Sequence, residues 1–342
     1  MKKEKRVTVN DVAQQAGVSL KTASRVFNNS PHVSQQKRQA VLKAAEKLKF
    51  KPNMSARQLA SNRSYVLVHF YDNANTDYIA KIYEGMLKAC HKYHYYAVAE
   101  PLSLENGKYA DTIINYVGQF NIDGVILSPP ICDDAKLLAR LKAENINYVL
   151  ISPKNLRPED YAVFVNEETA SQKITDYLID MGHKKIAYVG GPETHGAARQ
   201  RKRGFENSIM KAFGDTHQNS QVNGDFSMQS GHDAYLKIMK QSPDITAIFA
   251  ANDEMAFGVM MAALNHGLKI PQDISIAGYD NSRLAALFWP SLTTIAPPVD
   301  DMASCATEVL INILTGNTSQ DKHYEFPVNL FLRDSCAAVG NK

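Results

Sequence analysis

Residues 8–28 read TVNDVAQQAGVSLKTASRVFN, a stretch that predicts two short helices joined by a glycine turn. Thr8 and Asp11 have the spacing of a capping box, and apolar residues follow at helical spacing. Gly17 breaks this first helix, and Ser19 can cap the next. Two helices joined in this way form a helix-turn-helix, whose second helix enters the major groove of DNA.

The second predicted helix carries side chains suited to DNA. Leu20, Lys21 and Arg25 would face base edges, and arginine can pair bidentately with guanine. Short hydroxyls would contact phosphates and fix the register, namely those of Thr8, Ser19, Thr22 and Ser24. The alternative is a three-helix bundle in a scaffold, with Lys21 and Arg25 merely solvated.

Beyond this motif the head continues as short helices. Ser34 is expected to cap a third helix, which Pro52 ends, and a last helical stretch, Asn53 to Leu59, precedes the polar linker 61–64. Up to Ser64 the chain has 14 Lys and Arg against three acids, a net charge of +11, whereas the remainder has 24 against 32, or −8. A small basic head on an acidic body is typical of a nucleic-acid-binding module fused to another domain.

The four cysteines lie far apart without metal-type spacing, at Cys90, Cys132, Cys305 and Cys336. We therefore expect no metal site, no disulfide framework and no cofactor. The lysine-rich start does not run into an apolar stretch, and no segment is long enough to span a membrane. The expected location is the cytoplasm, with no membrane partner.

From Tyr65 onward, short apolar runs alternate with amphipathic helical stretches, which is typical of βαβ units in a parallel sheet. The predicted strands are Tyr65–Tyr71, Tyr95–Ala99, Gly124–Pro129, Tyr148–Ser152, Lys185–Gly190, Ala247–Ala251 and Ser275–Tyr279. They are too many for one sheet of usual size, so two α/β subdomains are expected. Ligands of such sheets bind at the carboxyl ends of the strands, which are followed here by Asp72, Ser152, the 192–199 loop, Asn252-Asp253 and Asp280-Asn281.

The order of motifs in the head resembles that of the lac repressor/galactose repressor family. The resemblance rests on residues 8–28, Val33-Ser34, Phe50-Lys51-Pro52-Asn53 and Ala56-Arg57-Gln58-Leu59-Ala60 in the head. In the body it rests on Gly182-His183, Val189-Gly190-Gly191-Pro192, Arg203-Gly204-Phe205, Ala251-Asn252-Asp253, Gly278-Tyr279-Asp280 and Leu292-Thr293-Thr294-Ile295. It covers essentially the whole chain. The fold class that it implies is α/β: an all-α helix-turn-helix head and a body of two doubly wound parallel-sheet subdomains, like periplasmic sugar-binding proteins.

The resemblance also implies how the head engages DNA. Residues 56–59 match a hinge helix that orders in the minor groove, where Leu59 would wedge into the central base step. The further positions that it assigns to the DNA side are Asn28, Ser34, Asn53 and Ala56. Hinge helices act in pairs, so the expected assembly is a homodimer on double-stranded operator DNA with pseudo-palindromic symmetry. No heptad tail follows the last matched strand, so no coiled-coil tetramer is expected.

In the body, the resemblance implies a small-molecule effector in the cleft between the subdomains. It matches Arg199 to a clamping arginine, Asn252 and Asp280 to polar ligand residues, and Phe226 to a stacking aromatic. The other expected cleft residues are Asp72, Tyr78 and Ser152. Structural alternatives are a turn role for Asp280, helix capping by Asn252-Asp253, and a core position for Phe226.

One departure from the family bears on the effector. Many relatives have Asn-Pro-Phe-Phe where this chain reads Asn75-Thr76-Asp77-Tyr78, so an acid and a tyrosine replace two cleft aromatics. An added carboxylate disfavours an anion, which favours a sugar over a purine or a sugar phosphate. A purine, nucleoside or sugar-phosphate effector, a corepressor role, and a dual activator and repressor stay open as alternatives.

The resulting prediction is a repressor of carbohydrate-utilisation genes that a small sugar releases from its operator. Its predicted domains are a helix-turn-helix at 1–52, a hinge and linker at 53–64, and an effector-binding and dimerisation domain at 65–342. Within the last, one subdomain is expected at about 65–165 and 297–325, the other at about 166–296 and 326–340. An enzyme is disfavoured, because neither a dinucleotide-binding fingerprint nor a P-loop is present and neither His183 nor His195 has a nucleophile or metal partner suggested by spacing. A periplasmic binding protein of the same fold is disfavoured by the DNA-binding head and the missing signal peptide.

Overall fold

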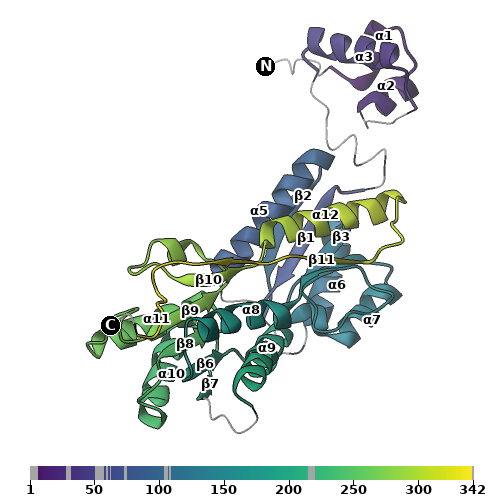
Figure 1. The fold of residues 1–342 in the computed structure, drawn as a ribbon. Helices are drawn as coiled ribbons and strands as arrows, with labels where there is room; N and C mark the ends of the chain where they lie inside the picture. The colour runs from purple at the N-terminus through teal and green to yellow at the C-terminus, as the bar shows by residue number, and fades with distance from the viewer. Residues whose placement is uncertain are drawn as a thin grey trace, which may run out of the picture. The chain divides into compact units, whose positions relative to one another are not determined.

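The structure is a computed structural model, and it describes residues 7–27, 32–50, 58, 61, 63–72, 75–103, 107, 109–214 and 220–340. The chain divides into two compact units, residues 1–64 and residues 65–342 (Figure 1). Over the described ranges, none of the helices has the length and apolar character needed to cross a membrane.

The first unit contains three described helices, α1 (Val9–Gln15), α2 (Leu20–Phe27) and α3 (Gln35–Lys47). The capping box is present, because the Thr8 hydroxyl accepts from the backbone N–H of Asp11 while the Asp11 carboxylate accepts from the Thr8 backbone N–H. Gly17 turns the chain with φ of +64°, and the Ser19 hydroxyl caps α2 through the Thr22 amide. Ser34 occupies the N-cap of α3, but its side chain makes no capping hydrogen bond, so that expected bond is absent.

The three helices enclose a small apolar core. Its buried members lie on one face of each helix, and they are Val12, Ala13, Ala23, Val26, Val41, Ala44 and Ala45. The ring of Phe27 packs on Phe50 with 5.2 Å between centroids, which closes the core at one end. The helical spacing of these residues therefore accounts for the fold of the head.

The second unit contains two six-stranded sheets. The first sheet has the order β11-β5-β4-β3-β1-β2 and is parallel throughout. Its strands are β1 (Val66–Tyr71), β2 (Tyr96–Pro101), β3 (Gly124–Leu127), β4 (Asn147–Ile151), β5 (Ala162–Val165) and β11 (His323–Phe326). The helices that cover it are α5 (Thr76–Tyr93), α6 (Tyr109–Phe120), α7 (Ala135–Ala143) and α12 (Val299–Thr315), of which α5 and α12 pack closely on each other (Figure 1).

The second sheet has the order β12-β10-β9-β8-β6-β7, with only the edge strand β12 antiparallel among its described pairings. Its strands are β6 (Ile186–Gly190), β7 (Gln221–Asn223), β8 (Ala247–Ala250), β9 (Ser275–Tyr279), β10 (Thr293–Ala296) and β12 (Asn329–Phe331). Its helices are α8 (Glu167–Asp180), α9 (Gly196–Phe213), α10 (Met228–Gln241) and α11 (Asp253–Asn265). The central strands are buried on both faces, as doubly wound sheets require.

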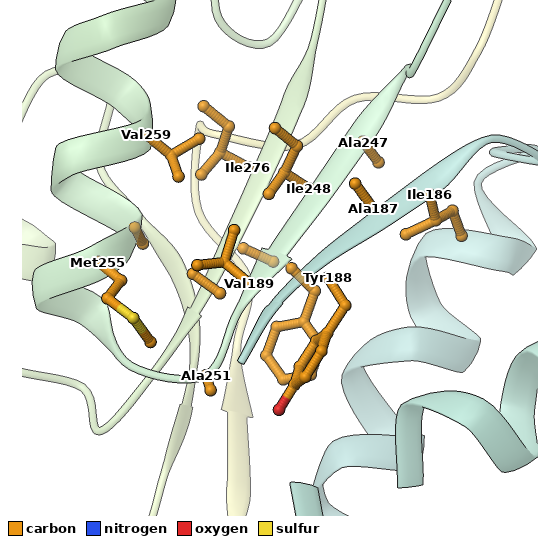
Figure 2. Close-up of a cluster of buried hydrophobic side chains, with 14 of the residues drawn as sticks. Ile186, Ala187, Tyr188, Val189, Ala247, Ile248, Ala251, Met255, Val259 and Ile276 are labelled. Carbon is orange, nitrogen blue, oxygen red and sulfur yellow. The ribbon is translucent and has the colours of Figure 1, made fainter. Parts of the chain in front are cut away.

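The core of the second sheet shows this two-sided burial directly. In Figure 2, Ile248 and Ile276 of neighbouring strands lie beside Val259 of α11. On the opposite face Tyr188 stacks on Phe205 of α9 with 5.0 Å between ring centroids. Apolar contact on both faces fixes the register of these strands, because a slip of one residue would exchange the two faces.

The predicted fold class is confirmed: a helical head precedes a body with two doubly wound, mainly parallel sheets. All seven predicted strands are present within one or two residues of their expected bounds. Five short strands outside those seven complete the sheets, at 162–165, 221–223, 293–296, 323–326 and 329–331. The chain passes from one sheet to the other between β5 and α8, between β10 and α12, and between β11 and β12.

Candidate ligand cavity and nucleic-acid interface

Helix α2 presents a polar face with one large apolar side chain. Ala23 and Val26 point into the head core, so the opposite face is solvent-exposed. Leu20, at the first position of the helix, has 52% of its surface exposed, and Lys21 and Arg25 are exposed beside it. A large apolar side chain beside two cations on the exposed face of the second helix suits base-edge contact in a major groove.

The predicted phosphate-binding hydroxyls lie at the ends of the helices. Those of Thr8, Ser19 and Thr22 already take part in capping or in the Ser19–Thr22 hydrogen bond of 2.9 Å, while Ser24 is exposed on α2. Ser34 stands exposed at the start of α3. The remaining predicted DNA contacts lie outside the described residues, namely Asn28, Asn53, Ala56 and Leu59.

In the second unit, a cavity of about 80 Å³ opens where the carboxyl ends of the two sheets face each other. Its walls come from both sheets and from the segment that crosses between them. The lining residues are Asn75, Tyr78, Pro129, Ser152, Val165, Glu167, His195, Ala197, Arg201, Phe226, Asn252, Asp280, Pro297, Val299 and Met302. Five of the seven expected cleft residues are among them, and this is the position expected for a ligand of open α/β sheets.

Arg199 and Asp72, the other two expected residues, lie elsewhere. Arg199 borders a separate surface depression and donates a hydrogen bond to the backbone carbonyl of Glu193. Asp72, at the end of β1, lies near enough to His195 to favour the protonated form of that ring. The arginine in the cavity is Arg201, which lies two residues further along α9 and therefore points to the opposite side of the helix.

Arg201 is held firmly in place although it is charged and only 8% exposed. Its Nε and Nη2 donate to the two carboxylate oxygens of Glu167, at 2.8 and 3.3 Å. Its Nη1 donates to the backbone carbonyl of Ala251 at 2.6 Å, and the guanidinium lies 3.6 Å from the centre of the Tyr279 ring. A bidentate pair of this kind fixes both position and orientation.

Asp280 sits at the end of β9 with φ of +108°, where it meets groups from both sheets. Its carboxylate accepts from the Asn75 side chain at 3.3 Å and lies 3.8 Å from Arg201. Lys81 of α5 donates to the backbone carbonyls of Asp280 and Asn281 at 2.9 and 3.0 Å. Burial raises the pKa of Asp280 from 3.8 to about 7, so this carboxyl can carry a proton near neutral pH.

Phe226 forms an aromatic wall of the cavity. Its backbone has φ of +71°, and its ring lies over Gly191, where an added Cβ would come within 2.2 Å of the ring. The ring also meets His195 edge-on, with 5.5 Å between centroids. Asn252 donates to the Phe226 carbonyl at 2.9 Å and accepts from the Met255 amide, so it both caps α11 and holds the loop that carries Phe226.

Two further cavity residues, Tyr78 and His195, have pKa values shifted from the usual range. Burial raises the pKa of Tyr78 far above its usual range, so its hydroxyl keeps its proton and can donate. Burial lowers the pKa of His195, which keeps its ring neutral near pH 7, although Asp133 opposes the shift. Together with Arg201 and Asp280, these groups give the cavity both hydrogen-bond donors and acceptors beside an aromatic face.

Two charged cavity residues, Arg201 and Glu167, were not predicted from the sequence, and Asp77 joins Arg199 and Asp72 among the residues expected in the cleft that do not line the cavity. Arg201 falls at the helical spacing of Ala198 and Phe205, so its place on the buried face of α9 was the signal that could have found it. Glu167 follows β5, a strand that was not predicted. Asp77, which we expected in the cleft, forms an ion pair with Lys81 at 3.3 Å and is not a lining residue.

No group of three or more His, Cys, Asp or Glu side chains that could hold a metal ion occurs among the residues with described positions. The cavity offers hydrogen bonds, an aromatic face and one compensated ion pair, which are the kinds of contact that hold and orient a small molecule.

Known protein families match both units. Residues 8–53 match the model described as bacterial regulatory proteins, lacI family, and residues 175–336 match the periplasmic binding protein-like domain. The HTH-type transcriptional repressor PurR of Escherichia coli O1:K1 / APEC is 30% identical over 334 residues, which cover 96% of this chain and 97% of that protein.

Two solved structures share the whole architecture. The lac repressor dimer bound to operator and the anti-inducer ONPF is 26% identical, with a TM-score of 0.75 and coverage of 98% of this chain and 100% of that chain. The complex of the transcriptional regulator CelR with cellobiose is also 26% identical, with a TM-score of 0.73 and coverage of 96% and 100%. With a lacI-type head, a periplasmic-binding-like body and relatives of this identity along nearly its full length, the chain belongs to the lacI family of bacterial regulatory proteins and is a DNA-binding transcription regulator.

Proposed function

We propose that this regulator represses carbohydrate-utilisation genes and leaves its operator when a small sugar fills the cavity between the two sheets. The cavity itself is the observation that carries the proposal. It combines an aromatic wall, Phe226, with the polar groups of Arg201, Asp280 and Tyr78, as recognition of a hydroxylated ring requires. The CelR–cellobiose complex supports a sugar as the ligand class.

The size of the cavity favours a single ring. A buried water needs roughly 10–15 Å³ of such space, so 80 Å³ corresponds to about five to eight waters. A monosaccharide has a comparable number of polar atoms to replace them. A larger sugar would require the two sheets to move apart.

We further propose a function for each segment of the chain. Residues 1–52 bind the operator, 53–64 form the hinge and linker, and 65–342 bind the effector and pair two copies, with subdomains at about 65–165 with 297–325 and 166–296 with 326–340. The base-reading residues would be Leu20, Lys21 and Arg25. The other assigned DNA contacts are Thr8, Ser19, Thr22, Ser24, Asn28, Ser34, Asn53, Ala56 and Leu59. Such a protein works where the operator is, in the cytoplasm.

The proposed switch is a change in how the two subdomains face each other. Asn75, the N-cap of α5, and Lys81 within α5 contact Asp280 and Asn281, which follow β9 of the other sheet. Contacts between the two subdomains therefore lie next to the cavity. A ligand that binds one arrangement better shifts the balance by its differential affinity. A hundredfold change in operator affinity requires about 2.7 kcal/mol of coupling, within the usual range for allostery.

We also propose that the regulator acts as a homodimer. Three large apolar side chains within six positions of the chain are exposed, those of Leu284, Leu287 and Trp289, the last two at 76% and 82%; we call this segment the apolar patch. Exposed apolar clusters of this kind mark interfaces, and the lac repressor structure is a dimer. Two heads held in one dimer suit a pseudo-palindromic operator.

The test couples ligand binding to operator release. The purified protein is screened against neutral sugars, sugar phosphates, nucleosides and purines by its melting temperature, since a ligand of the folded state raises it. The ligand found is then titrated into a complex of the protein with an operator selected from random DNA, and fluorescence anisotropy reports release. We expect one neutral sugar to stabilise the protein and to release the DNA.

Other outcomes would redirect the proposal. Tighter operator binding in the presence of the ligand would make it a corepressor. Stabilisation by a purine or nucleoside alone would replace the sugar class, and an unchanged operator affinity at saturating ligand would contradict the proposed switch. A reporter gene under the operator distinguishes a repressor from a dual regulator by the sign of the change.

A further inference from the structure

Two carboxyl groups, those of Glu167 and Asp280, lie beside the one guanidinium of the cavity, that of Arg201. Arg201, Glu167 and Asp280 all line it, and the bidentate pair leaves Arg201 and Glu167 together without net charge. Asp280 lies 3.8 Å from Arg201 on the other side. A cavity with an unpaired arginine would attract phosphate or carboxylate, whereas this arrangement does not.

Glu167 owes its position to the start of helix α8. Asn166 caps the helix through the Thr169 amide, and Glu167 is the first residue inside it. Its side chain is only 5% exposed and turns inward to Arg201, whereas its neighbour Glu168 turns outward to Asn207 and Arg203. Of these two neighbouring acids, Glu167 is therefore buried in the cavity and Glu168 lies at the surface.

The pairing also decides which donors of Arg201 face a ligand. A guanidinium has five N–H donors, and three of them are taken by Glu167 and the Ala251 carbonyl. Two N–H groups are left for a ligand, next to the acceptor oxygens of Asp280 and the hydroxyl donor of Tyr78. Two donors beside a carboxylate fit neighbouring hydroxyls, each of which both donates and accepts.

We propose that Glu167 determines the charge class of the effector: by compensating Arg201 it makes the cavity accept an uncharged polyhydroxy ligand and reject phosphorylated or carboxylated ones. This inference rests on the proposed effector role of the cavity. An anionic group on the remaining N–H groups of Arg201 would meet a guanidinium whose charge Glu167 already compensates. Asp280, 3.8 Å from the same guanidinium, adds repulsion whenever its carboxyl is ionised. Glu167 is therefore a specificity-determining residue that acts partly through Arg201.

The wild-type protein gives the first test. Melting temperatures are measured with a panel of hexoses and pentoses, with their phosphates and uronates, and with inorganic phosphate, all at constant ionic strength. We expect an uncharged member to stabilise the protein and its charged counterparts to bind at least roughly tenfold more weakly. Stabilisation by a sugar phosphate or uronate equal to or greater than that by its neutral counterpart would overturn the inference.

The variant Glu167→Gln tests the cause, with Glu168→Gln as its matched control. Both remove one negative charge from the first turn of α8, but only the first removes it from the cavity. We expect Glu167→Gln to gain stabilisation by inorganic phosphate, with a dissociation constant lower by roughly tenfold than in the wild type, and Glu168→Gln to behave like the wild type. An equal phosphate response in both variants contradicts the role of Glu167.

Failure of this inference can be told apart from failure of the proposed function. The phosphate response of Glu167→Gln depends only on the charge around Arg201 and needs no knowledge of the natural effector. If phosphate binds this variant but no neutral sugar releases the operator, the charge assignment stands and the sugar-release proposal fails. If a neutral sugar releases the operator but the variant gains no phosphate binding, the proposed function stands and Glu167 does not set the charge class.

Discussion

At the scale of single residues, the Asp280 carboxyl makes the free energy of unfolding depend on pH. Its pKa is raised by burial from 3.8 to about 7, a shift that Asp253 and Glu167 support and that Arg201 and Lys81 oppose. The folded state therefore keeps a proton between about pH 4 and 7 that the unfolded chain has lost, and the free energy of unfolding falls as the pH rises through this window. One such group contributes a slope of at most about 1.4 kcal/mol per pH unit.

We expect Asp280→Asn to flatten the decline in stability between pH 5 and 7.5, measured by urea unfolding of the full chain. A residual slope is expected from Asp253, whose pKa burial raises to about 6 and which has the same sign. The exposed Asp180 offers a control, and Asp180→Asn should leave the wild-type slope in place. A slope in Asp280→Asn as steep as in the wild type would contradict the assigned protonation.

In the head, Arg25 offers a test of base recognition. Arg25→Ala should lower affinity for the selected operator by about 1–3 kcal/mol and relax the preference at one base pair, because a bidentate contact to guanine is lost. Lys43→Ala, an exposed change on α3, serves as the control and should affect operator and random DNA alike. Anisotropy titrations with both DNAs measure the ratio. If Arg25→Ala lowered the affinity for operator and for random DNA equally, Arg25 would contact a phosphate and not a base.

Arg199 and Arg201 of α9 show where sequence reasoning succeeds and where it stops. The sequence indicates that an arginine of this segment enters the cleft, but the residue we chose, Arg199, lies on the outer side of the helix. The helical spacing of Ala198, Arg201 and Phe205 places Arg201 on the buried face of α9 and therefore indicates that it is the arginine of the cavity. Glu167 could not be found in this way, because its inward turn depends on a partner from another helix.

At the scale of elements, the strands that were not predicted are short, and several of them lie at the edges of the sheets. The seven predicted strands include the central ones, whose two-sided burial demands continuous apolar runs such as Ile186–Gly190. The strands that were missed are three or four residues long, and edge strands such as β7 and β11 contain half-exposed and polar residues. Short edge strands are defined by their neighbours and not by their own pattern, so sequence periodicity does not report them.

Close packing of helices α8 and α9 underlies the cavity. A Cβ at Gly204 would lie 2.2 Å from the carbonyl oxygen of Glu168 and 2.8 Å from the Cβ of Ser171. Gly204→Ala must therefore push α9 away from α8, which also separates Arg201 from Glu167. We expect a loss of about 1–3 kcal/mol in unfolding free energy together with weaker binding of the neutral sugar.

A helical glycine in open space provides the comparison for Gly204. Gly118 of α6 has no heavy atom within 4 Å of an added Cβ. Gly118→Ala should raise the unfolding free energy by about 0.5–1 kcal/mol, because alanine restricts the unfolded chain and favours the helix. Urea unfolding and calorimetric titration of both variants provide the measurement, and equal effects of the two changes would show that α8 and α9 do not need the glycine.

At the scale of the whole molecule, the sequence already separates the two units. The net charge changes sign after Ser64, and the contacts divide the chain at the same place. What the sequence does not show is the surface on which two copies would meet. Leu284, Leu287 and Trp289 follow β9 in a segment without clear periodicity, and their exposure appears only once the 3₁₀ turn Arg283–Ala286 is folded.

The proposed pairing through this patch would make operator affinity depend on protein concentration. Replacing Leu287 by Asp and Trp289 by Ala places a charge in the patch and removes its largest side chain, so we expect a monomer at micromolar concentration by light scattering. One copy contacts one half-site, so operator affinity should fall by at least roughly a hundredfold, while binding of the neutral sugar, measured by calorimetry, is retained. Leu236 of α10 is exposed and lies outside this segment of the chain, so it provides the control. Leu236→Asp should leave both the dimer and the operator complex intact. A stable dimer of the double variant would show that two copies meet on another surface, and a monomer with unchanged operator affinity would show that pairing is not what brings two heads to the DNA.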